Sequence, residues 1–471
     1  MERKALTVSL IVGGTFLMEN LDGTVITTAL PQMAKSFHAD PLHLSIGVST
    51  YIIMLAVFIP VSGWITERFG LKKVFGTAIL GFVVSSVLCG FSYNLVTFTL
   101  ARTLQGIFGS MMVPVGRLSV LRNTAKHDLV SAIAFITWPG LIGPIIGPFV
   151  GGYITTYFSW HWIFFINVPL GIIAFLLVLK FIPDTKEYKK KPLDFKGFIL
   201  STIGMIGFMI GLESISNRML SFTTSTLLVL ASASVFYAFY RHTKKTKYPL
   251  IDFTEMRTKT YAVTIYSGSL TRMVIGMAPF LTPMMFQVGF GLNAFQSGTL
   301  LMATMIGNLS MKPATVWITK NFSFRAVLVV NTILLSLSSF AMVLLFPETP
   351  HWMIITVLFI SGMIRSVQFS SLNTLAYADV PAERMNNANT LYSTAQQMSL
   401  GMGITLGAIS LRTASLINHT NFNYQVKDFH LAFALIGALG LLTLFEYLKL
   451  SPRDGVSVRN IKKRIPVKTT P

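Results

Sequence analysis

The sequence of 471 residues contains little charge, few acidic side chains and a single cysteine. Asp, Glu, Lys and Arg together make up 12% of it, whereas a typical soluble domain has about 25%. A soluble globule of this composition would expose much apolar surface, so the low charge favours a membrane protein and excludes intrinsic disorder. The lone cysteine, Cys89, excludes an intramolecular disulfide and therefore a disulfide-stapled secreted domain.

Long apolar runs dominate the sequence, in which hydrophobic residues reach 52% and the mean hydropathy is +0.62. A helix that crosses a bilayer needs about 20 apolar residues. Fourteen such blocks occur, at 8–30, 44–66, 74–92, 95–117, 131–154, 162–182, 194–214, 222–240, 262–285, 295–318, 324–346, 351–375, 392–413 and 429–448. They are continuously apolar, which excludes a β-barrel, and the first is too long for a signal peptide. We therefore expect an all-α polytopic membrane protein with fourteen transmembrane helices.

The few charges are strongly asymmetric, because 38 Lys and Arg against 18 Asp and Glu give a net charge of +20. With the first residue inside, the outer segments hold only Lys35, Arg218, Arg412 and Lys427 among the bases. The positive-inside rule then places both termini in the cytoplasm, and we expect a bacterial inner membrane. The charge orients the protein and can contact anionic lipid, and it is no evidence for nucleic acid.

A weak internal repeat divides the chain. The residues Trp64–Thr66 recur as Trp317–Thr319, and the pattern of Arg102 and Gln105 recurs within Arg365–Gln368. Both matches pair a span with the eighth span after it, which predicts two six-helix bundles separated by a two-helix insert. The segments that we expect are a six-helix bundle at 1–183, an insert with basic cytoplasmic loops at 184–260, a second six-helix bundle at 261–450 and a basic tail at 451–471.

Ionisable side chains inside a membrane are costly and therefore mark candidate functional sites. Glu19 and Asp22 of the first span lie one turn apart, so the two carboxylates can interact. Burial and like charge favour the protonated carboxyl, which would allow proton exchange near neutral pH. Asp22 and Arg102 of the fourth span lie at similar depths, so they form a candidate proton switch. The alternatives are a static ion pair and, for Glu19, attraction of cationic substrates.

The fifth span is rich in glycine and proline. Its candidate residues for a bend are Gly143, Pro144, Gly147, Pro148, Gly151 and Gly152. Glycines four residues apart give a smooth face that lets a neighbouring helix approach closely, whereas prolines free backbone carbonyls and favour a kink. Tight packing alone explains the glycines, but the two Gly-Pro pairs also indicate a bend that reshapes a central cavity.

The connection between the second and third spans is a charged turn framed by glycines. Its candidate residues for a cytoplasmic gate are Gly63, Glu67, Arg68, Gly70, Lys72 and Lys73. The glycines allow a compact turn, and Glu67 can pair with a basic group or a helix N-terminus. The alternative is an ordinary loop that obeys the positive-inside rule.

These motifs resemble the major facilitator superfamily, within it the 14-span drug:proton antiporter branch, and most closely multidrug-resistance proteins of the MdtD type. The resemblance covers nearly the whole chain. The residues that carry it are Leu21, Asp22, Thr24, Ala29–Pro31, Gly63, Arg68, Gly70, Lys72, Lys73, Arg102, Gln105, Gly106, Met112–Arg117, Gly147, Pro148, Gly151, Gly152, Ser159–Trp162 and Asn167–Pro169. It implies a role of Arg102 in proton transfer and an antiporter motif in the fifth span. Glu67 stands where the family has Asp, Glu19 where a neutral polar residue is expected, and Lys320 with Asn321 where the second half would repeat the acid–base pair.

The second half offers Arg272, Lys312 and Arg365 inside its spans. Lys312 can snorkel to the cytoplasmic surface, and the arginines can pair helices. If the two arginines face a central cavity, they favour an anionic or zwitterionic substrate over a lipophilic cation. The substrate-cavity residues that we predict are Gln105, Trp138, Arg272, Arg365 and Gln368.

The sequence contains no enzyme motif and no nucleotide-binding loop, so we expect transport driven by a proton gradient, without a cofactor or metal site. The resemblance implies a secondary active, proton-coupled exporter of drugs or small amphipathic compounds that works by alternating access. One alternative is an exporter of a specific organic anion or metal chelate, which Arg272 and Arg365 favour. Another is a membrane sensor or assembly partner that transports nothing. The expected partners are a small-molecule substrate, protons and the lipid bilayer, with no nucleic acid and no obligate protein partner.

Overall fold

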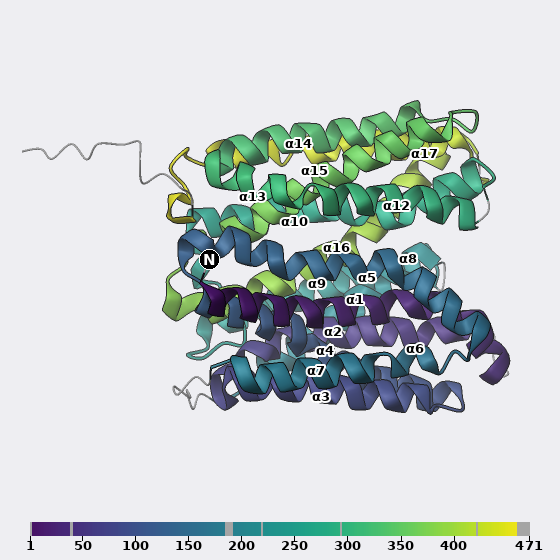
Figure 1. The fold of residues 1–471 in the computed structure, drawn as a ribbon. Helices are drawn as coiled ribbons and strands as arrows, with labels where there is room; N and C mark the ends of the chain where they lie inside the picture. The colour runs from purple at the N-terminus through teal and green to yellow at the C-terminus, as the bar shows by residue number, and fades with distance from the viewer. Residues whose placement is uncertain are drawn as a thin grey trace, which may run out of the picture.

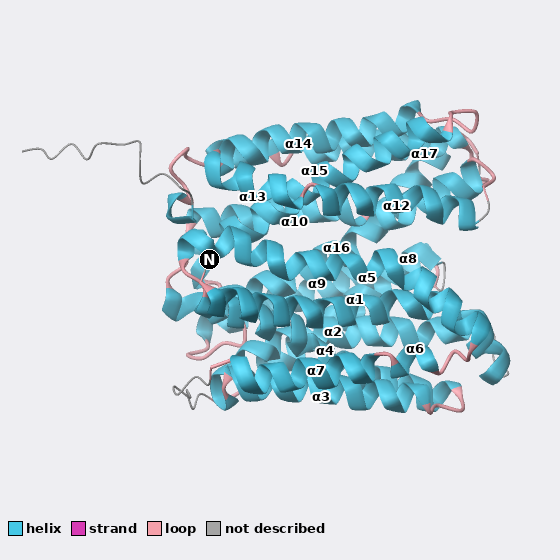
Figure 2. Ribbon diagram, viewed as in Figure 1, coloured by secondary structure: helices cyan, strands magenta, loops and turns pink. Residues whose placement is uncertain are grey.

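The computed structural model describes residues 2–37, 41–183, 192–217, 220–292, 294–420 and 423–458. Within these ranges the regular structure is helical and no strand occurs (Figure 2). The predicted loop residues 184–191 and tail residues 459–471 lie outside the described part of the chain. The all-α class that the apolar blocks predict is confirmed.

The long helices run roughly parallel or antiparallel to one another (Figure 1). Their bounds are α1 Arg3–Phe37, α2 Pro41–Phe69, α3 Leu71–Gly90, α4 Leu95–Asn123, α5 Leu129–Tyr157, α6 Trp162–Phe165, α7 Asn167–Phe181, α8 Phe195–Asn217, α9 Phe222–Lys245, α10 Lys259–Gly276, α11 Ala278–Met284, α12 Ala294–Ser310, α13 Lys312–Asn321, α14 Phe324–Ala341, α15 His351–Ala378, α16 Met385–Ile417, α17 Val426–Leu441 and α18 Leu444–Lys449. Each predicted apolar block overlaps one of these helices or two consecutive ones. In the described part of the chain, 11 helices are long and apolar enough to cross a membrane. The other blocks lie in α1, in α10 with α11, and in α12 with α13.

The helix contacts follow the same pattern in both parts of the chain. α1 packs on α5, α2 on α4 and α3 on α7, while α10 packs on α16, α12 on α15 and α14 on α17. Counted as spans, every contact of the second set joins the spans that lie eight places after the spans of a contact in the first set. The two sequence matches show the same shift of eight spans. α8 and α9 pack on each other, and α8 also contacts α2 and α16, one helix from each set.

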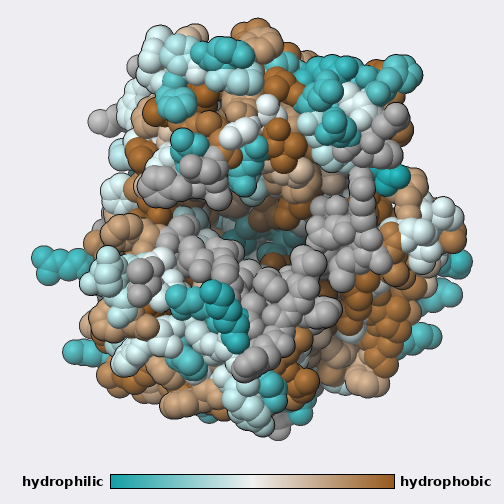
Figure 3. Space-filling model, turned by 90° about the vertical axis from the view of Figure 1, so that its right-hand side faces the viewer, coloured by the Kyte–Doolittle hydropathy of each residue, from teal (hydrophilic) through white to brown (hydrophobic). Residues whose placement is uncertain are grey.

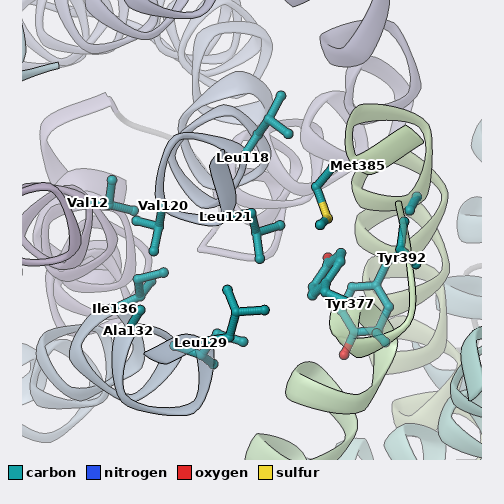
Figure 4. Close-up of a cluster of buried hydrophobic side chains, with 14 of the residues drawn as sticks. Val12, Leu118, Val120, Leu121, Leu129, Ala132, Ile136, Tyr377, Met385 and Tyr392 are labelled. Carbon is teal, nitrogen blue, oxygen red and sulfur yellow. The ribbon is translucent and has the colours of Figure 1, made fainter. Parts of the chain in front are cut away.

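A single hydrophobic cluster joins the two sets of helices near the N-terminus. It includes Val8 of α1, Leu121 of α4 and Leu129 of α5 together with Tyr377 and Met385 of the second set. Figure 4 shows Leu121 and Leu129 facing Met385 and Tyr377 across the boundary. The opposite end of the molecule is hollowed at its centre (Figure 3). The two sets of helices are therefore held together at the end that carries the N-terminus.

Large apolar side chains also cover the outer surface of the helices. Examples are Leu100, Phe149, Leu176 and Trp352, which are between 58% and 78% exposed. A soluble protein seldom exposes apolar surface on this scale, whereas a lipid-facing surface requires it.

Candidate functional site

A buried ion pair links α1 to α4. Arg102 donates through Nη1 to Oδ2 of Asp22 at 2.7 Å, and the two side chains are 0% and 1% exposed. Gln105 closes the triangle, because its Nε2 donates to Oδ1 of Asp22 at 3.0 Å and its Oε1 accepts from Nη1 of Arg102 at 2.6 Å. The structure thus brings Asp22, Arg102 and Gln105 together, while their role in proton coupling stays a prediction.

Two further polar residues complete this cluster: Asn167, which belongs to the Asn167–Pro169 motif of the family resemblance, and Ser86, which the sequence does not single out. Asn167, the first residue of α7, donates through Nδ2 to Oδ1 of Asp22 at 2.8 Å and to Oγ of Ser86 at 2.9 Å. Ser86 in turn donates to the carbonyl of Phe164 at 3.0 Å. Neutral side chains carry no charge penalty in a membrane, so apart from the family resemblance the one signal for Asn167 is an amide in an otherwise apolar block.

The local sequence of α4 explains how Arg102 reaches this position. Asn94 caps the helix by accepting from the backbone N–H of Thr97 at 2.8 Å, which fixes where α4 begins. One turn beyond Arg102 lies Gly106, where a Cβ would come within 2.6 Å of the carbonyl of Tyr51. The missing side chain lets α2 approach closely, and the ring of Tyr51 lies 4.2 Å from the Arg102 guanidinium.

The glycines of α5 hold α1 in register. A Cβ on Gly143 would lie 2.9 Å from the backbone nitrogen of Leu21, and a Cβ on Gly147 would collide with Oγ1 of Thr24. Thr24 also donates to the carbonyl of Gly143 at 3.4 Å. Gly152 differs, since nothing lies near the position of its Cβ. The glycine face therefore fixes the two residues that flank Asp22 along α1.

The predicted bend of the fifth span is not visible as a helix break. α5 runs without interruption from Leu129 to Tyr157, with Gly151 buried and Pro144 half-buried on it. The side chain of Pro148 lies outside the described part of the chain. The bend and its antiporter role stay a prediction.

Glu19 stands apart from the Asp22 cluster. It lines a cavity of about 50 Å³ between the two sets of helices, and its buried Oε2 has no hydrogen-bond partner among the described residues. Arg117 of α4 lines the same cavity and crosses to α16, donating to Oγ of Ser393 at 3.4 Å and to Oε1 of Gln396 at 3.3 Å. The acid Glu19 and the base Arg117 thus line the same small cavity without forming an ion pair.

The predicted gate residues meet α16. Asn386 donates through Nδ2 to the carbonyl of Gly63 at 3.0 Å and to Oε1 of Glu67 at 3.1 Å. Asn389 donates to the carbonyl of Pro114 at 2.7 Å, which adds a bond from α16 to α4. The asparagines of α16 escape sequence reasoning because a polar residue near a helix end is common.

The rest of the loop has an ordinary turn geometry. Gly70 has a φ of 88°, which favours glycine, and it separates α2 from α3. The guanidinium of Arg68 lies 5.5 Å from the ring of Trp64. Lys72 and Lys73 follow in the first turn of α3, where Lys73 is exposed.

The candidates of the second half share no partner with one another, and one of them has none among the described residues. Arg272 is fully buried and donates to the hydroxyl of Tyr392 at 2.6 Å and to the carbonyl of Thr264 at 3.2 Å. Gln368 donates to Oγ1 of Thr332 at 3.1 Å. Arg365 has no hydrogen-bond or ion-pair partner among the described residues, and its Nε is buried.

Two expectations for this half need correction or refinement. Lys312 does not snorkel to the surface, because it is only 3% exposed and donates to Oγ of Ser370 at 2.8 Å. Trp138 lines a cleft with Lys312 and is 41% exposed, and Gln105 does not line that cleft. The position of Lys312 near the end of its span predicts snorkelling, but it does not reveal that α15 packs over the lysine side chain.

Comparisons with known proteins agree with this architecture. Residues 12–404 match the sequence profile of the Major Facilitator Superfamily. The MdtD protein of Serratia proteamaculans (strain 568), named a multidrug resistance protein, is 36% identical over 96% of this chain and 95% of its own length. The MdtD protein of Escherichia coli O17:K52:H18 (strain UMN026 / ExPEC) is 36% identical over 85% of each chain.

Solved structures show the same fold at low sequence identity. The human organic anion transporter MFSD10 (TETRAN) is 13% identical, with a TM-score of 0.66 over 95% of this chain and 100% of that one. The proton:xylose symporter XylE is 13% identical, with a TM-score of 0.65 over 96% of each chain. The relatives identified by sequence are transporters rather than enzymes. This chain, a multi-pass membrane transporter of small molecules, belongs to the Major Facilitator Superfamily.

Proposed function

We propose that this transporter is a proton-coupled antiporter that exports drugs or small amphipathic compounds across a bacterial inner membrane, with both termini in the cytoplasm. The observation that supports proton coupling is the buried cluster in which Asp22 faces Arg102 with almost no exposure. A carboxylate in such a site is stable while the arginine pairs with it and binds a proton when the pair separates. The name of the MdtD relatives supports drugs as the substrate class.

The arrangement of the helices supports alternating access. We propose that bundles at 1–183 and 261–450 rock about the central site, with the insert at 184–260 beside them. The hydrophobic cluster and the bonds of Asn386 and Asn389 close the end that carries the N-terminus. Because the opposite end is hollowed (Figure 3), this arrangement corresponds to an outward-open state.

Proton flux in proteoliposomes tests the coupling. Asp22→Asn keeps the size of the side chain and removes the exchangeable proton, so we expect substrate-driven proton flux to be lost while the protein stays inserted. Glu348→Gln, at an exposed side chain between α14 and α15, is the control and should transport normally. Full coupled export by the Asp22→Asn protein would refute proton coupling at this site.

A double variant separates the switch from a static ion pair. Asp22→Asn alone leaves Arg102 buried without a counter-charge, which is strongly destabilising. Combining it with Arg102→Gln removes both charges and should restore much of the thermal stability. A static pair predicts that transport returns together with stability, whereas a proton switch predicts a stable protein that no longer couples transport to protons.

A second candidate function is export of an organic anion or a metal chelate. The observation in its favour is that Arg272, Lys312 and Arg365 lie inside the second bundle without a carboxylate partner among the described residues. A panel of cationic and anionic solutes in inverted vesicles distinguishes the two functions. Proton flux elicited by anions alone would favour this second function.

A further inference from the structure

The cleft lined by Trp138 and Lys312 lies between α5 and α13, at the boundary between the two bundles. It has a volume of about 340 Å³, and apolar side chains such as Phe135 and Val316 form most of its wall. Its volume falls within the range of about 300–1,000 Å³ that is usual for small-molecule sites. Trp138 and Pro313 also line it and are exposed, so the cleft is open to the surface of the protein.

At this cleft α5 is joined to the last turn of α12, just before α13, by a hydrogen bond that proline makes available. Pro313 has no N–H, so the carbonyl of Leu309 one turn earlier loses its usual helical donor. α12 ends at Ser310 and α13 begins at Lys312 around this position. Trp138 of α5 donates through Nε1 to the carbonyl of Leu309 at 3.3 Å. The indole is thereby held at the mouth of the cleft.

A buried cation forms the polar part of the cleft. Lys312 lines it, is 3% exposed and donates to the neutral hydroxyl of Ser370. No carboxylate pairs with it among the described residues. An ammonium that is buried without a counter-charge is costly, and the N-terminus of α13 adds positive partial charge at the same point. The cleft is therefore apolar along its wall and complementary to an anion at Lys312.

We propose that this cleft binds a single-chain anionic amphiphile of the membrane, such as a long-chain fatty acid. Its carboxylate would pair with Lys312, and its hydrocarbon chain would lie against Phe135, Trp138 and Val316. The exposed Trp138 and Pro313 at its mouth would let such a molecule enter from the lipid. This inference goes beyond the proposed export and does not depend on proton coupling through Asp22.

Binding of radiolabelled oleate to the purified full-length protein in neutral detergent tests the proposal. We expect Lys312→Met to weaken binding by about tenfold or more, because the carboxylate loses its counter-charge. Lys312→Arg keeps the charge and should bind nearly as the wild type does. Lys320→Met makes the same change in the last turn of α13, outside the cleft, and should leave binding unchanged. Since Lys312→Met removes a buried charge, its thermal stability should equal or exceed that of the wild type.

Three results would overturn the proposal. The first is wild-type affinity in the Lys312→Met protein. The second is equal binding of the alcohol with the same hydrocarbon chain, because the cleft would then not recognise charge. The third is displacement of oleate by an anionic phospholipid at equal concentration, which would indicate a two-chain lipid site. Efflux assays are not needed for any of these results, so failure of the proposed transport function would leave this test intact.

Discussion

At the scale of single residues, Asp22 is held by side chains from two other helices. Arg102 and Gln105 come from α4 and Asn167 comes from α7. The arginine supplies the charge, whereas the two amides fix the direction in which each carboxylate oxygen points. Separation of Asp22 from Arg102 therefore also requires a change at α7, which links the chemistry of the acid to the position of a third helix.

Removal of the Asn167 amide should weaken this link. We expect Asn167→Ala to lower thermal stability by on the order of 1 kcal/mol, the usual scale for a polar contact inside a membrane, and to impair proton-coupled export more strongly than stability. Thermal unfolding and proton flux measured on the same preparation check this expectation. Ser85→Ala is a matched control, because Ser85 bonds only within α3. An Asn167→Ala protein with normal proton coupling would contradict the expected role.

His161 gives a pH dependence outside the membrane spans. Its ring lies 3.8 Å from that of Trp160, and burial lowers its pKa from the usual value of 6.5. The unfolded chain therefore binds a proton more readily, so stability that is present above this value is lost as the pH falls. We expect the melting temperature to fall on acidification below pH 6.5, and less so in His161→Gln. His127→Gln, at a side chain that is 70% exposed, should keep the wild-type pH profile.

The sequence predicts charged site residues better than neutral ones. Asp22 and Arg102 are recognisable because a charge inside an apolar block is costly and its depth follows from the helical rise. Asn167 enters only through the family resemblance and Asn386 not at all, because an amide has no such cost and its partner comes from a distant helix. Lys312 is recognised as a charge, but its burial depends on α15, which no periodicity within its own block reveals.

At the scale of helices, the two ends of the glycine motif in α5 should behave differently. Gly143→Ala places a methyl group against the backbone of α1, which cannot rotate away, so we expect a loss of about 1–3 kcal/mol of stability. Gly152→Ala fills open space and should be neutral or slightly stabilising. Thermal unfolding of the two variants checks this pair. Equal stability would show that the α1–α5 contact is looser than the structure indicates.

Apolar blocks locate helices but not their ends. The first block covers 8–30, whereas α1 extends from Arg3 to Phe37. Hydrophobicity marks the part of a helix in the hydrocarbon, and polar turns continue beyond it. The interruption at Met311 follows from Pro313, a local signal, whereas the choice of Trp138 as the donor to the freed carbonyl depends on packing between the bundles.

At the scale of the whole molecule, Asn386 and Asn389 tie α16 to α2 and α4. We expect their combined replacement by alanine to favour opening at this end. Ser393→Cys provides a reporter beside Glu19, since the native Cys89 is buried. Maleimide should label that reporter several-fold faster when both asparagines are replaced. The control is Asn331→Ala, which removes bonds to Ile364 and Gln368 within one bundle. An unchanged labelling rate would show that these bonds do not restrain opening.

The uneven distribution of buried charge has an electrical consequence. In the first bundle Glu19 and Asp22 balance Arg102 and Arg117. Three buried cations of the second bundle have no acidic partner among the described residues, namely Arg272, Lys312 and Arg365. Moving one elementary charge across a membrane potential of 100 mV changes the free energy by about 2.3 kcal/mol. Three cations displaced through about a tenth of the field would thus change it by about 0.7 kcal/mol. The second bundle would therefore act as a voltage sensor, and the membrane potential would bias the transporter towards one orientation even when its transport cycle moves no net charge.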